Sequence, residues 1–547
     1  MSLAVVPEAA PHEAAQEPDY IRAKSGVLSW LLTVDHKRIA LLYLGTVTIT
    51  FFLGGLFALA LRTELLVPDH GIMDAMTYNR MFTLHGVTMV FFFMIPAIPG
   101  VFGNFFLPIM IGAHDVAFPR LNLLSYYLYL AAVILGLWGM IHGGTDTGWT
   151  FYTPYSTTTT TAVLPILAAA FINGFSSILT GVNFIVTIHT LRADGLHWMR
   201  LPLFLWSIYG TAVIQVLATP VIGITLALAG VEHFLGTGIF DPAHGGDPIL
   251  FQHLFWFYSH PAVYIMVLPA FGVASELVGA FTRKPLVGYK MIALSTFGIA
   301  FVGFLAWGHH LFTSGQSAVD AGVFGFVSML IGIFTSIKIF NWVASMYKAS
   351  IYMTSPFLYT LGFFFLTVFG GMSGVALATI SLDVHWQDTY FVIAHFHFIM
   401  AGGVVLMFVG GLHYWFPKMF GKLYNESWAM VAAVLVILGF IGTFTPQFLL
   451  GNEGMPRRYY SYPPHFQFLH VTSTIFAYIL GMGLLLALIN LIIGLINGPR
   501  AGNNPWGAPQ YEWDTPSPPP EHNFSATPVI NRDPYEYRGQ EIIENAN

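Results

Sequence analysis

The chain has 547 residues, of which 55% are hydrophobic and only 9% are charged. An ordinary soluble protein has about 25% charged residues, so this composition excludes a disordered chain and an ordinary soluble enzyme. With 21 Lys and Arg against 27 Asp and Glu, the chain has no basic surplus with which to bind nucleic acid. It has no cysteine, which excludes disulfides, thiolate metal ligands and a thiol nucleophile. It does contain 21 histidines, more than packing requires, and we therefore expect a membrane protein in which histidines have a function.

Twelve apolar stretches are long enough to cross a bilayer, which takes about 20 residues each. In chain order, the predicted spans are residues 39–61, 84–112, 124–142, 163–191, 203–231, 250–280, 288–313, 318–346, 354–379, 388–416, 428–451 and 466–497. We therefore predict an all-α integral membrane protein, a bundle of about twelve transmembrane helices within residues 39–498. Residues 1–38 contain no apolar signal sequence, and the Pro-rich residues 499–547 are predicted to form an extended tail.

The distribution of Lys and Arg predicts the orientation of the bundle. Most of these residues precede the first span or fall in loops on the same side as the N-terminus, and the opposite loops contain only Arg62, Arg80, Arg457 and Arg458. Because cytoplasmic loops carry the excess of Lys and Arg, both termini are predicted to be cytoplasmic. The four exceptions require an explanation.

Six of the histidines within the predicted spans, where ionisable side chains are costly and are functional by default, can be placed by depth. They are His85 in the second span, His260 in the sixth, His309 and His310 at the end of the seventh, and His395 and His397 in the tenth. Alternate spans run in opposite directions, so a rise of 1.5 Å per residue places all six within about 15 Å of the outer surface. A single membrane histidine is readily explained by packing or by a water cavity, but a shared depth on four helices predicts metal binding.

The spacing of these residues divides them into groups. His395 and His397 are two residues apart, about 200° around a helix, so they suit two different metals on either side of one helix. His260 and Tyr264 are four residues apart and share a helix face. Together with His260, the adjacent His309 and His310 could supply three imidazoles to a copper-like ion.

These residues and their order resemble the large catalytic subunit of the haem–copper oxygen reductases of the cytochrome c oxidase type. The resemblance covers nearly the full chain, from Asp35-His36-Lys37 to Asn504-Pro505-Trp506-Gly507. It implies a bacterial inner-membrane respiratory oxidase with two haems, of the haem A type, and one copper ion. It implies that His85 and His397 bind the low-spin haem and that His395 binds the high-spin haem. It also implies that His260, His309 and His310 bind copper. It also implies that Tyr264 is covalently joined to His260 and supplies an electron and a proton.

The resemblance accounts for most of the outer arginines. Arg457 and Arg458 resemble the pair that binds haem propionates, and Arg62 resembles the arginine that bonds the formyl group of the low-spin haem. The family has a His-Asp pair at a magnesium site between subunits, where this chain has Gln387 and Asp388. Asp388 is therefore a magnesium ligand candidate with a weaker neighbour. Asp383 resembles a propionate-side acid, and it could equally be a solvated loop residue.

The resemblance implies two proton-uptake routes from the inner side. The residues of the first are Asp115, Asn104, Asn122, Ser176 and Ser177, and those of the second are Lys338, Thr335 and Ser275. Lys338 is hard to explain by packing because the only other charged residue of its span is Asp320, at the opposite end. The Ser and Thr residues could instead simply bond back to their own helices.

One departure from the commonest branch of the family concerns the first route. That branch has a glutamate two residues after the first copper histidine, and this chain has Ala262 there. Tyr258 and Ser259, which resemble a second branch, provide hydroxyls nearby, and Tyr258 lies on the same helix face as Ala262. We expect Tyr258 to pass protons along a water chain; the alternative is that it packs against haem.

The predicted function is reduction of oxygen to water, coupled to proton translocation, with cytochrome c as electron donor. Quinol-using relatives carry a His and a Gln where this chain has Thr77 and Arg80. Since the chain has no Cys, a copper centre that receives the electrons must lie on another subunit, and the expected partners are subunit II, subunit III and other membrane subunits. The alternatives are a quinol oxidase, a nitric oxide reductase, and a passive transporter or channel. Nitric oxide reductases lack the tyrosine that this chain has at position 264, which argues against the second alternative.

Overall fold

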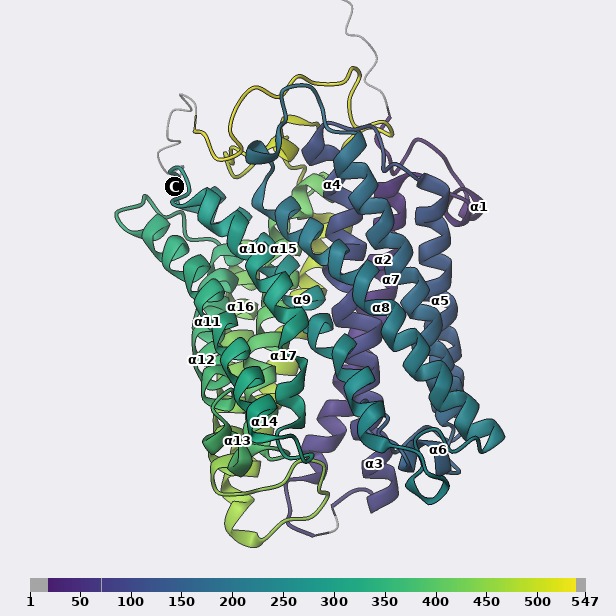
Figure 1. The fold of residues 1–547 in the computed structure, drawn as a ribbon. Helices are drawn as coiled ribbons and strands as arrows, with labels where there is room; N and C mark the ends of the chain where they lie inside the picture. The colour runs from purple at the N-terminus through teal and green to yellow at the C-terminus, as the bar shows by residue number, and fades with distance from the viewer. Residues whose placement is uncertain (1–17, 70, 538–547) are drawn as a thin grey trace, which may run out of the picture.

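A computed structural model describes residues 18–69 and 71–537. Within these residues, twelve helices are long and apolar enough to cross a membrane, which confirms the predicted fold class. The helices run side by side along one axis (Figure 1). Their bounds are His36–Glu64 (α2), Ala75–Ile111 (from α3 to α4), Pro119–Ile141 (α5), Val163–Thr190 (α7), Leu203–Leu235 (α8), Pro248–Phe281 (α9), Tyr289–Leu311 (α10 and the 3₁₀-helix η5), Ala318–Met346 (α11), Ser355–Leu377 (α12), Tyr390–Phe420 (from α14 to α15), Glu426–Asn452 (α16) and Pro464–Asn497 (the 3₁₀-helix η7 and α17).

The connections contain only short regular elements. They are α1 (Val27–Leu31), α6 (Tyr155–Thr158), α13 (Ile380–Trp386) and the 3₁₀-helices η3 (Trp198–Arg200), η4 (Pro242–His244) and η8 (Tyr511–Asp514). The described residues form isolated β-bridges and no β-strand.

The second span begins earlier than its apolar residues predict, at Ala75 rather than at residue 84. The side chain of Asp74 accepts a hydrogen bond from the backbone N–H of Thr77 at 2.7 Å. Such an N-cap stabilises the first helical turn, so the polar residues that follow are helical although hydropathy gives no sign of it.

Two of the long helices contain π-helical turns next to candidate ligands. The second span consists of α3 (Ala75–Val87), η1 (Thr88–Met94), η2 (Ala97–Gly103) and α4 (Asn104–Ile111), and the tenth of α14 (Tyr390–Phe396), η6 (His397–Gly402) and α15 (Gly403–Phe420). The π-turns η1 and η6 begin three residues after His85 and at His397 itself. Such turns are rare in proteins, and where they do occur they often lie at functional sites.

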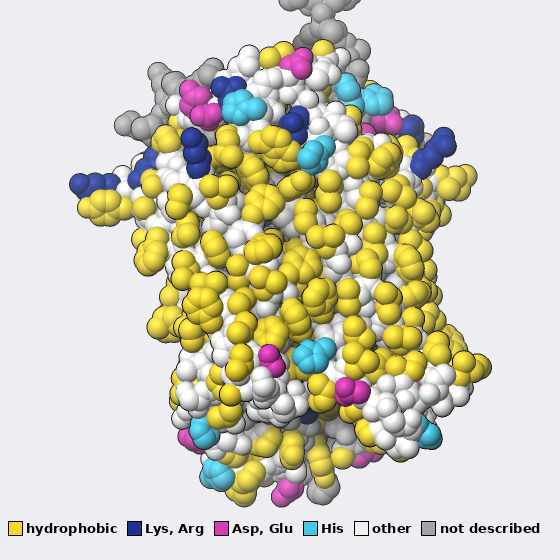
Figure 2. All heavy atoms as spheres, in the orientation of Figure 1, with side chains coloured by type: hydrophobic (Ala, Val, Ile, Leu, Met, Phe, Trp, Pro, Cys, Tyr) yellow, Lys and Arg dark blue, Asp and Glu magenta, His cyan; other side chains and the backbone are white. Residues whose placement is uncertain are grey.

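The surface has the character of a membrane protein. On the face that Figure 2 shows, hydrophobic side chains form a broad band across the middle, and most of the visible Lys and Arg side chains gather at the end where α1 lies (Figures 1 and 2). Large apolar side chains of the outer helices are widely exposed, among them Phe340 of α11 and Phe468 of α17. A band of this kind suits contact with lipid or with other membrane subunits.

Residues 499–537, which we call the C-terminal segment, have little regular structure, and they pack closely on the bundle. Trp513 is buried and its indole donates to the hydroxyl of Tyr414 at 2.6 Å. The hydroxyl of Tyr535 donates to the carboxylate of Glu276 on α9 at 2.7 Å. The apolar composition of the spans gives no indication of this packing. Residues 1–17 of the predicted N-terminal segment, and residues 538–547, lie outside the described part.

Candidate metal centres

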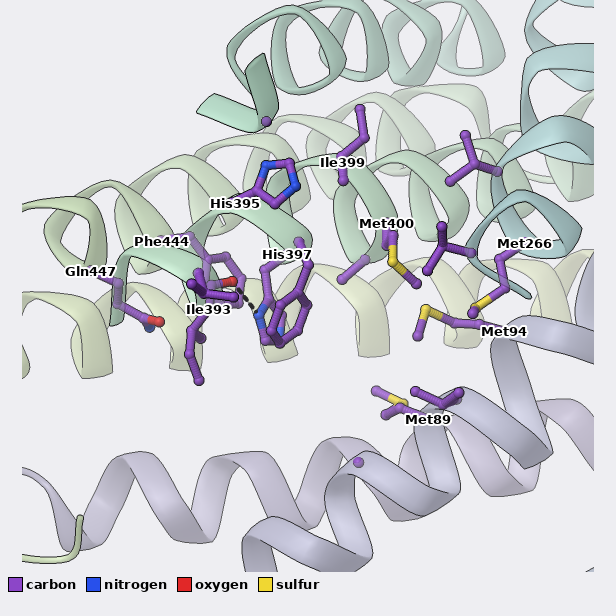
Figure 3. A pocket seen from close by; sticks show the side chains of 18 of the residues that line it. Met89, Met94, Met266, Ile393, His395, His397, Ile399, Met400, Phe444 and Gln447 are labelled. Atoms are coloured by element: carbon purple, nitrogen blue, oxygen red, sulfur yellow. Dashed lines mark hydrogen bonds between the residues drawn. The ribbon is translucent and has the colours of Figure 1, made fainter. Parts of the chain in front are cut away.

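A single cavity of about 2040 Å³ runs inside the bundle. It is lined by all six histidines that the sequence singles out, together with Tyr264 and the arginines Arg62, Arg457 and Arg458. Ordinary small-molecule pockets reach about 1,000 Å³, so this cavity has room for more than one large cofactor. Its wall is mostly apolar, with the side chains of Met89, Met94, Met266 and Met400 around it (Figure 3).

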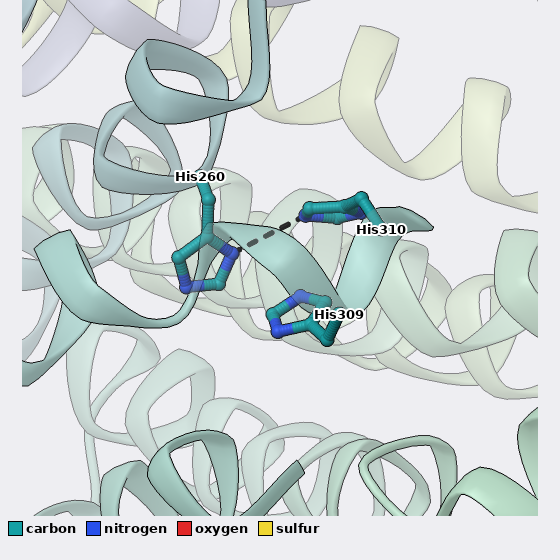
Figure 4. Close-up of side chains that lie close together, drawn as sticks. All are labelled: His260, His309 and His310. Carbon is teal, nitrogen blue, oxygen red and sulfur yellow. Dashed lines mark hydrogen bonds between the residues drawn. The ribbon is translucent and has the colours of Figure 1, made fainter. Parts of the chain in front are cut away.

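Three imidazoles converge at one side of this cavity. The candidate ligand atoms of His260, His309 and His310 all lie within 4.8 Å of one another, and Figure 4 shows the three rings turned toward a common point. No other such group of three or more His, Cys, Asp or Glu occurs in the described part of the chain. Imidazole nitrogens suit copper, zinc and iron, so the donor set fits a copper ion.

Neighbouring side chains orient these rings. Nδ1 of His309 lies 2.8 Å from Oγ of Ser328 on α11, and Trp256 stacks on His310 with ring centroids 3.5 Å apart. Such partners fix which ring nitrogen remains available to a metal.

Tyr264 lies beside the cluster, as its spacing predicts. Its hydroxyl is 3.0 Å from Nε2 of His260, while Nδ1 of the same ring lies 3.3 Å from Nε2 of His310. One nitrogen of His260 therefore faces the candidate metal position and the other faces the tyrosine.

His85 and His397 form a second arrangement. Their rings are parallel, at 3° to each other, with centroids 6.3 Å apart. Backbone carbonyls hold Nδ1 of both rings, that of Gly54 for His85 at 2.9 Å and that of Ile393 for His397 at 2.8 Å. Two imidazole–metal bonds of about 2 Å leave ring centroids roughly 6 Å apart. His85 and His397 would therefore suit as the two protein ligands of one haem iron.

His395 lies on another side of the same helix from His397, as the two-residue spacing predicts (Figure 3). Its Nδ1 lies 2.9 Å from the carbonyl oxygen of Gly370 and 3.0 Å from Oγ of Ser373. A Cβ atom at Gly374 would come 2.7 Å from Cε1 of His395, so the imidazole requires glycine there. One ligand on a separate face of the cavity fits the proximal ligand of a second haem.

The predicted propionate-side residues lie at one end of the cavity. Arg457 forms an ion pair with Asp388. Burial and the charge of Arg457 lower the pKa of Arg458 to about 10, so Arg458 is cationic at neutral pH and suits a carboxylate group. Burial, and then the charge of Asp388, raise the pKa of Asp383 to about 7. Asp383 is therefore a buried acid and not a solvated loop residue.

Arg62 is anchored on α17. Its Nη2 donates to the carbonyl oxygen of His470 at 2.8 Å and to Oγ1 of Thr474 at 3.1 Å. The guanidinium thus has a fixed position at the cavity wall.

The first group of predicted proton-route residues is spread over neighbouring elements. Asp115 lies in the loop after α4, where burial raises its pKa to about 7. Asn104 and Asn122 are buried. The hydroxyl of Ser176 donates to the carbonyl oxygen of Ser125 at 2.7 Å. The next residue, Ser177, is also buried.

The structure adds residues to this group that the sequence analysis missed. The hydroxyl of Tyr43 on α2 lies 3.2 Å from Oγ of Ser125 and 3.3 Å from Oγ of Ser176. The side-chain oxygen of Asn183 on α7 accepts a hydrogen bond at 2.9 Å from the backbone N–H of Phe118, three residues after Asp115. These residues are far apart in the sequence, and only the packing of α2, α5 and α7 brings them together.

The second group surrounds Lys338 on α11. Its ammonium donates to Oγ1 of Thr296 on α10, another residue that the sequence analysis missed. Thr335 lines the cavity. Ser275 accepts from the indole of Trp342, four residues after Lys338, at 3.1 Å. The three predicted residues therefore lie along the contacts of α9, α10 and α11.

Tyr258 and Ser259 both line the cavity and are buried, as is Ala262 one turn later. The side chains of Tyr258 and Ser259 thus line the cavity near Ala262, the position at which the commoner branch has a glutamate.

The chain is similar to several known proteins. A family model described as cytochrome c and quinol oxidase polypeptide I matches residues 38–479. "Cytochrome c oxidase subunit 1" of Thermostichus vulcanus is 42% identical over 521 residues, 95% of this chain and 94% of that protein. "Probable quinol oxidase subunit 1" of Staphylococcus haemolyticus is 40% identical over 511 residues, 92% and 77% of the two chains.

A solved structure shares the fold. A chain of a haem–copper terminal oxidase dimer, determined by cryo-electron microscopy, matches with a TM-score of 0.70 and 17% identity, and the match covers 85% of both chains. With its twelve spans and bacterial relatives, the protein is a multi-pass protein of a bacterial cell membrane. The chain therefore belongs to the cytochrome c and quinol oxidase polypeptide I family of haem–copper oxidoreductases.

Proposed function

We propose that this chain is the catalytic subunit of a terminal oxidase that reduces oxygen to water with electrons from cytochrome c and translocates protons. The observation that carries the proposal is the cluster of His260, His309 and His310 with Tyr264 beside it, in the same cavity as His395. Three imidazoles, one tyrosine and a separate proximal histidine are what a haem–copper pair requires.

The cofactor assignment follows the three ligand groups. His85 with His397 would hold one haem, His395 a second haem, and the three-histidine cluster a copper ion. We propose haem A for both haems, with Arg457 and Arg458 at their propionates and Arg62 at the low-spin haem. When bound, these metals supply the electron transfer and the oxygen-binding position.

The chain's own residues would supply the protons. The Tyr264 hydroxyl would hold a proton beside the copper ligands. Lys338 would carry protons toward that hydroxyl from the inner side, past Thr335 and Ser275, and Asp115 would collect protons for the other route. Asn104, Asn122, Ser176 and Ser177 would line that route, and Tyr258 and Ser259 would end it.

Asp388 is the candidate ligand of a further metal, magnesium. Magnesium at Asp388 would compete with Arg457, which already pairs with this carboxylate. We therefore propose a magnesium ligand role for Asp388 only where a partner subunit supplies further oxygen ligands.

The proposed partners are a subunit II that carries a copper centre, a subunit III, and cytochrome c at the outer face. The proposed orientation has both termini in the cytoplasm, because Lys and Arg gather at that end (Figure 2). Quinol is the second candidate donor, since one relative at 40% identity is named as a quinol oxidase. Thr77 and Arg80 stand where quinol users have His and Gln, which favours cytochrome c.

The test is a comparison of donors on the purified complex. Oxygen consumption with reduced cytochrome c, and little with a quinol, is the expected result. The opposite preference would contradict the donor assignment. An optical spectrum without haem A, or a preparation without copper, would contradict the cofactor assignment.

A further inference from the structure

The C-terminal segment reaches the loop that carries Asp115. Asn523 is almost fully buried there, at 1% exposure. Its side-chain amide Nδ2 donates to the carbonyl oxygens of Ala113 and His114, at 2.9 and 3.1 Å. These are the two residues directly before Asp115, so the amide fixes the backbone from which that carboxyl projects.

The same amide also holds the start of α2. Nδ2 of Asn523 lies 2.9 Å from Nε2 of His36, and its Oδ1 accepts from the ammonium of Lys37 at 2.9 Å. Lys37 in turn pairs with Asp35 at 3.1 Å and donates to the carbonyl oxygen of Glu521 at 2.8 Å. The other nitrogen of His36 lies 2.7 Å from the carbonyl oxygen of Asn104. One side chain therefore joins the start of α2, the loop after α4 and the C-terminal segment.

The backbone of Asn523 suits this position. Its φ is +65°, in the left-handed region that asparagine adopts more readily than most residues. A short amide in this conformation reaches all of its partners at once.

Asp115 is sensitive to the charges that Asn523 positions. The titratable groups around Asp115 and Asn523 include Asp35, His36 and Lys37 of α2 and its N-cap, His114 of the loop, and Glu521 and His522 of the C-terminal segment, with Lys24 and Arg38 near Glu521, whereas α7 contributes the neutral Asn183 and Thr187. Lys37 favours the charged form of the Asp115 carboxyl, and Asp35 opposes it. A change at Asn523 therefore alters both the place of the carboxyl and its proton affinity.

We infer that Asn523 is a positioning residue of the proton-uptake site at Asp115, so that the C-terminal segment is part of the proton route. The inference rests on the proposed function, in which Asp115 collects protons. It assigns to residues near the end of the chain a task that the transmembrane helices do not perform alone.

The first test is Asn523→Asp, which keeps the size of the side chain and adds a negative charge beside Lys37. That charge offsets the lysine, so the Asp115 carboxyl keeps its proton to higher pH. We expect the pH at which proton uptake by the vesicle-reconstituted complex falls to half to rise by roughly 0.5 to 1 unit. Asn503→Asp is the matched control, because Asn503 lies in the same segment and bonds Ser517; its profile should equal that of the wild type.

The second test is Asn523→Gly, which removes the amide while the left-handed backbone remains favourable. Proton uptake should slow several-fold with unchanged haem and copper content. A wild-type rate in this variant, or a wild-type pH profile in Asn523→Asp, would overturn the inference.

A third variant separates this inference from the proposed function. If Asp115→Asn blocks proton uptake while Asn523→Asp and Asn523→Gly behave as the wild type, the route stands and Asn523 has no part in it. If Asp115→Asn takes up protons normally, the proposed route is wrong, and the role of Asn523 fails with it.

Discussion

The ammonium group of Lys338 on α11 lies 2.6 Å from Oγ1 of Thr296 and 2.8 Å from the carbonyl oxygen of Ile292, both on α10. Both partners are neutral, and the lysine is buried at 1% exposure. A charged group in such surroundings is costly in a membrane and is functional by default. The arrangement suits a side chain that exchanges a proton and not one that only joins two helices.

Lys338→Met should therefore leave both haem spectra unchanged and slow the reduction of the high-spin haem by about 100-fold. Stopped-flow spectroscopy measures this rate. Lys418→Met is a suitable control, because Lys418 is also buried but donates to carbonyl oxygens of the C-terminal segment. Normal reduction kinetics in Lys338→Met would remove Lys338 from the proton route.

Tyr264→Phe should abolish oxygen chemistry without loss of the cofactors. The substitution removes one hydroxyl, 3.0 Å from Nε2 of His260, and leaves the histidine cluster in place. We expect both haems and copper to assemble while turnover, measured as oxygen consumption, falls by at least about 100-fold. A variant with ordinary turnover would contradict the role of this tyrosine.

His395→Asn should remove the high-spin, carbon-monoxide-reactive haem signal and keep the low-spin signal. The reason is that His395 and His397 lie on different sides of their helix, and only His397 pairs with His85. The measurement is the difference spectrum of the reduced complex with and without carbon monoxide. Persistent carbon monoxide binding would show that the two haems are assigned wrongly.

Tyr258→Phe tests the relay that replaces the glutamate missing at Ala262. Tyr258 lines the cavity, and without its hydroxyl a water chain loses one donor and acceptor. We expect this variant and Asp115→Asn both to lose pumping or turnover when assayed in vesicles. If Tyr258→Phe pumps normally and Asp115→Asn does not, the relay is water or Ser259 alone.

The proton route through Asp115 should also depend on pH in the wild type. Burial raises the pKa of this carboxyl to about 7, so it is protonated below that pH and loses its proton as the pH rises through it. The rate of proton uptake should decrease over the same interval. A rate that is flat between about pH 6 and 8 would exclude Asp115 as the group that limits uptake.

The sequence predicts the parts of this protein that depend on local patterns. Apolar length predicts the twelve helices, and residue spacing predicts that His395 and His397 diverge and that Tyr264 lies on the same helix face as His260, because helix geometry fixes both. Thr296 could not be found in this way, since it is one of many Ser and Thr residues in the spans and only the packing of α10 on α11 brings it to Lys338. The same holds for Asn523, whose partners lie more than 400 residues earlier in the chain.

The docking of the C-terminal segment has a consequence for the order of biosynthesis. Chains grow by about 5–20 residues per second during synthesis, so Asp115 is translated long before Asn523. All twelve long helices have therefore been translated before Asn523, which bonds the start of α2, is added to the chain. While the chain is still growing, this end of the bundle lacks the C-terminal segment. Under the proposed function, the proton-uptake site at Asp115 would be complete only after Asn523 has been translated and has docked.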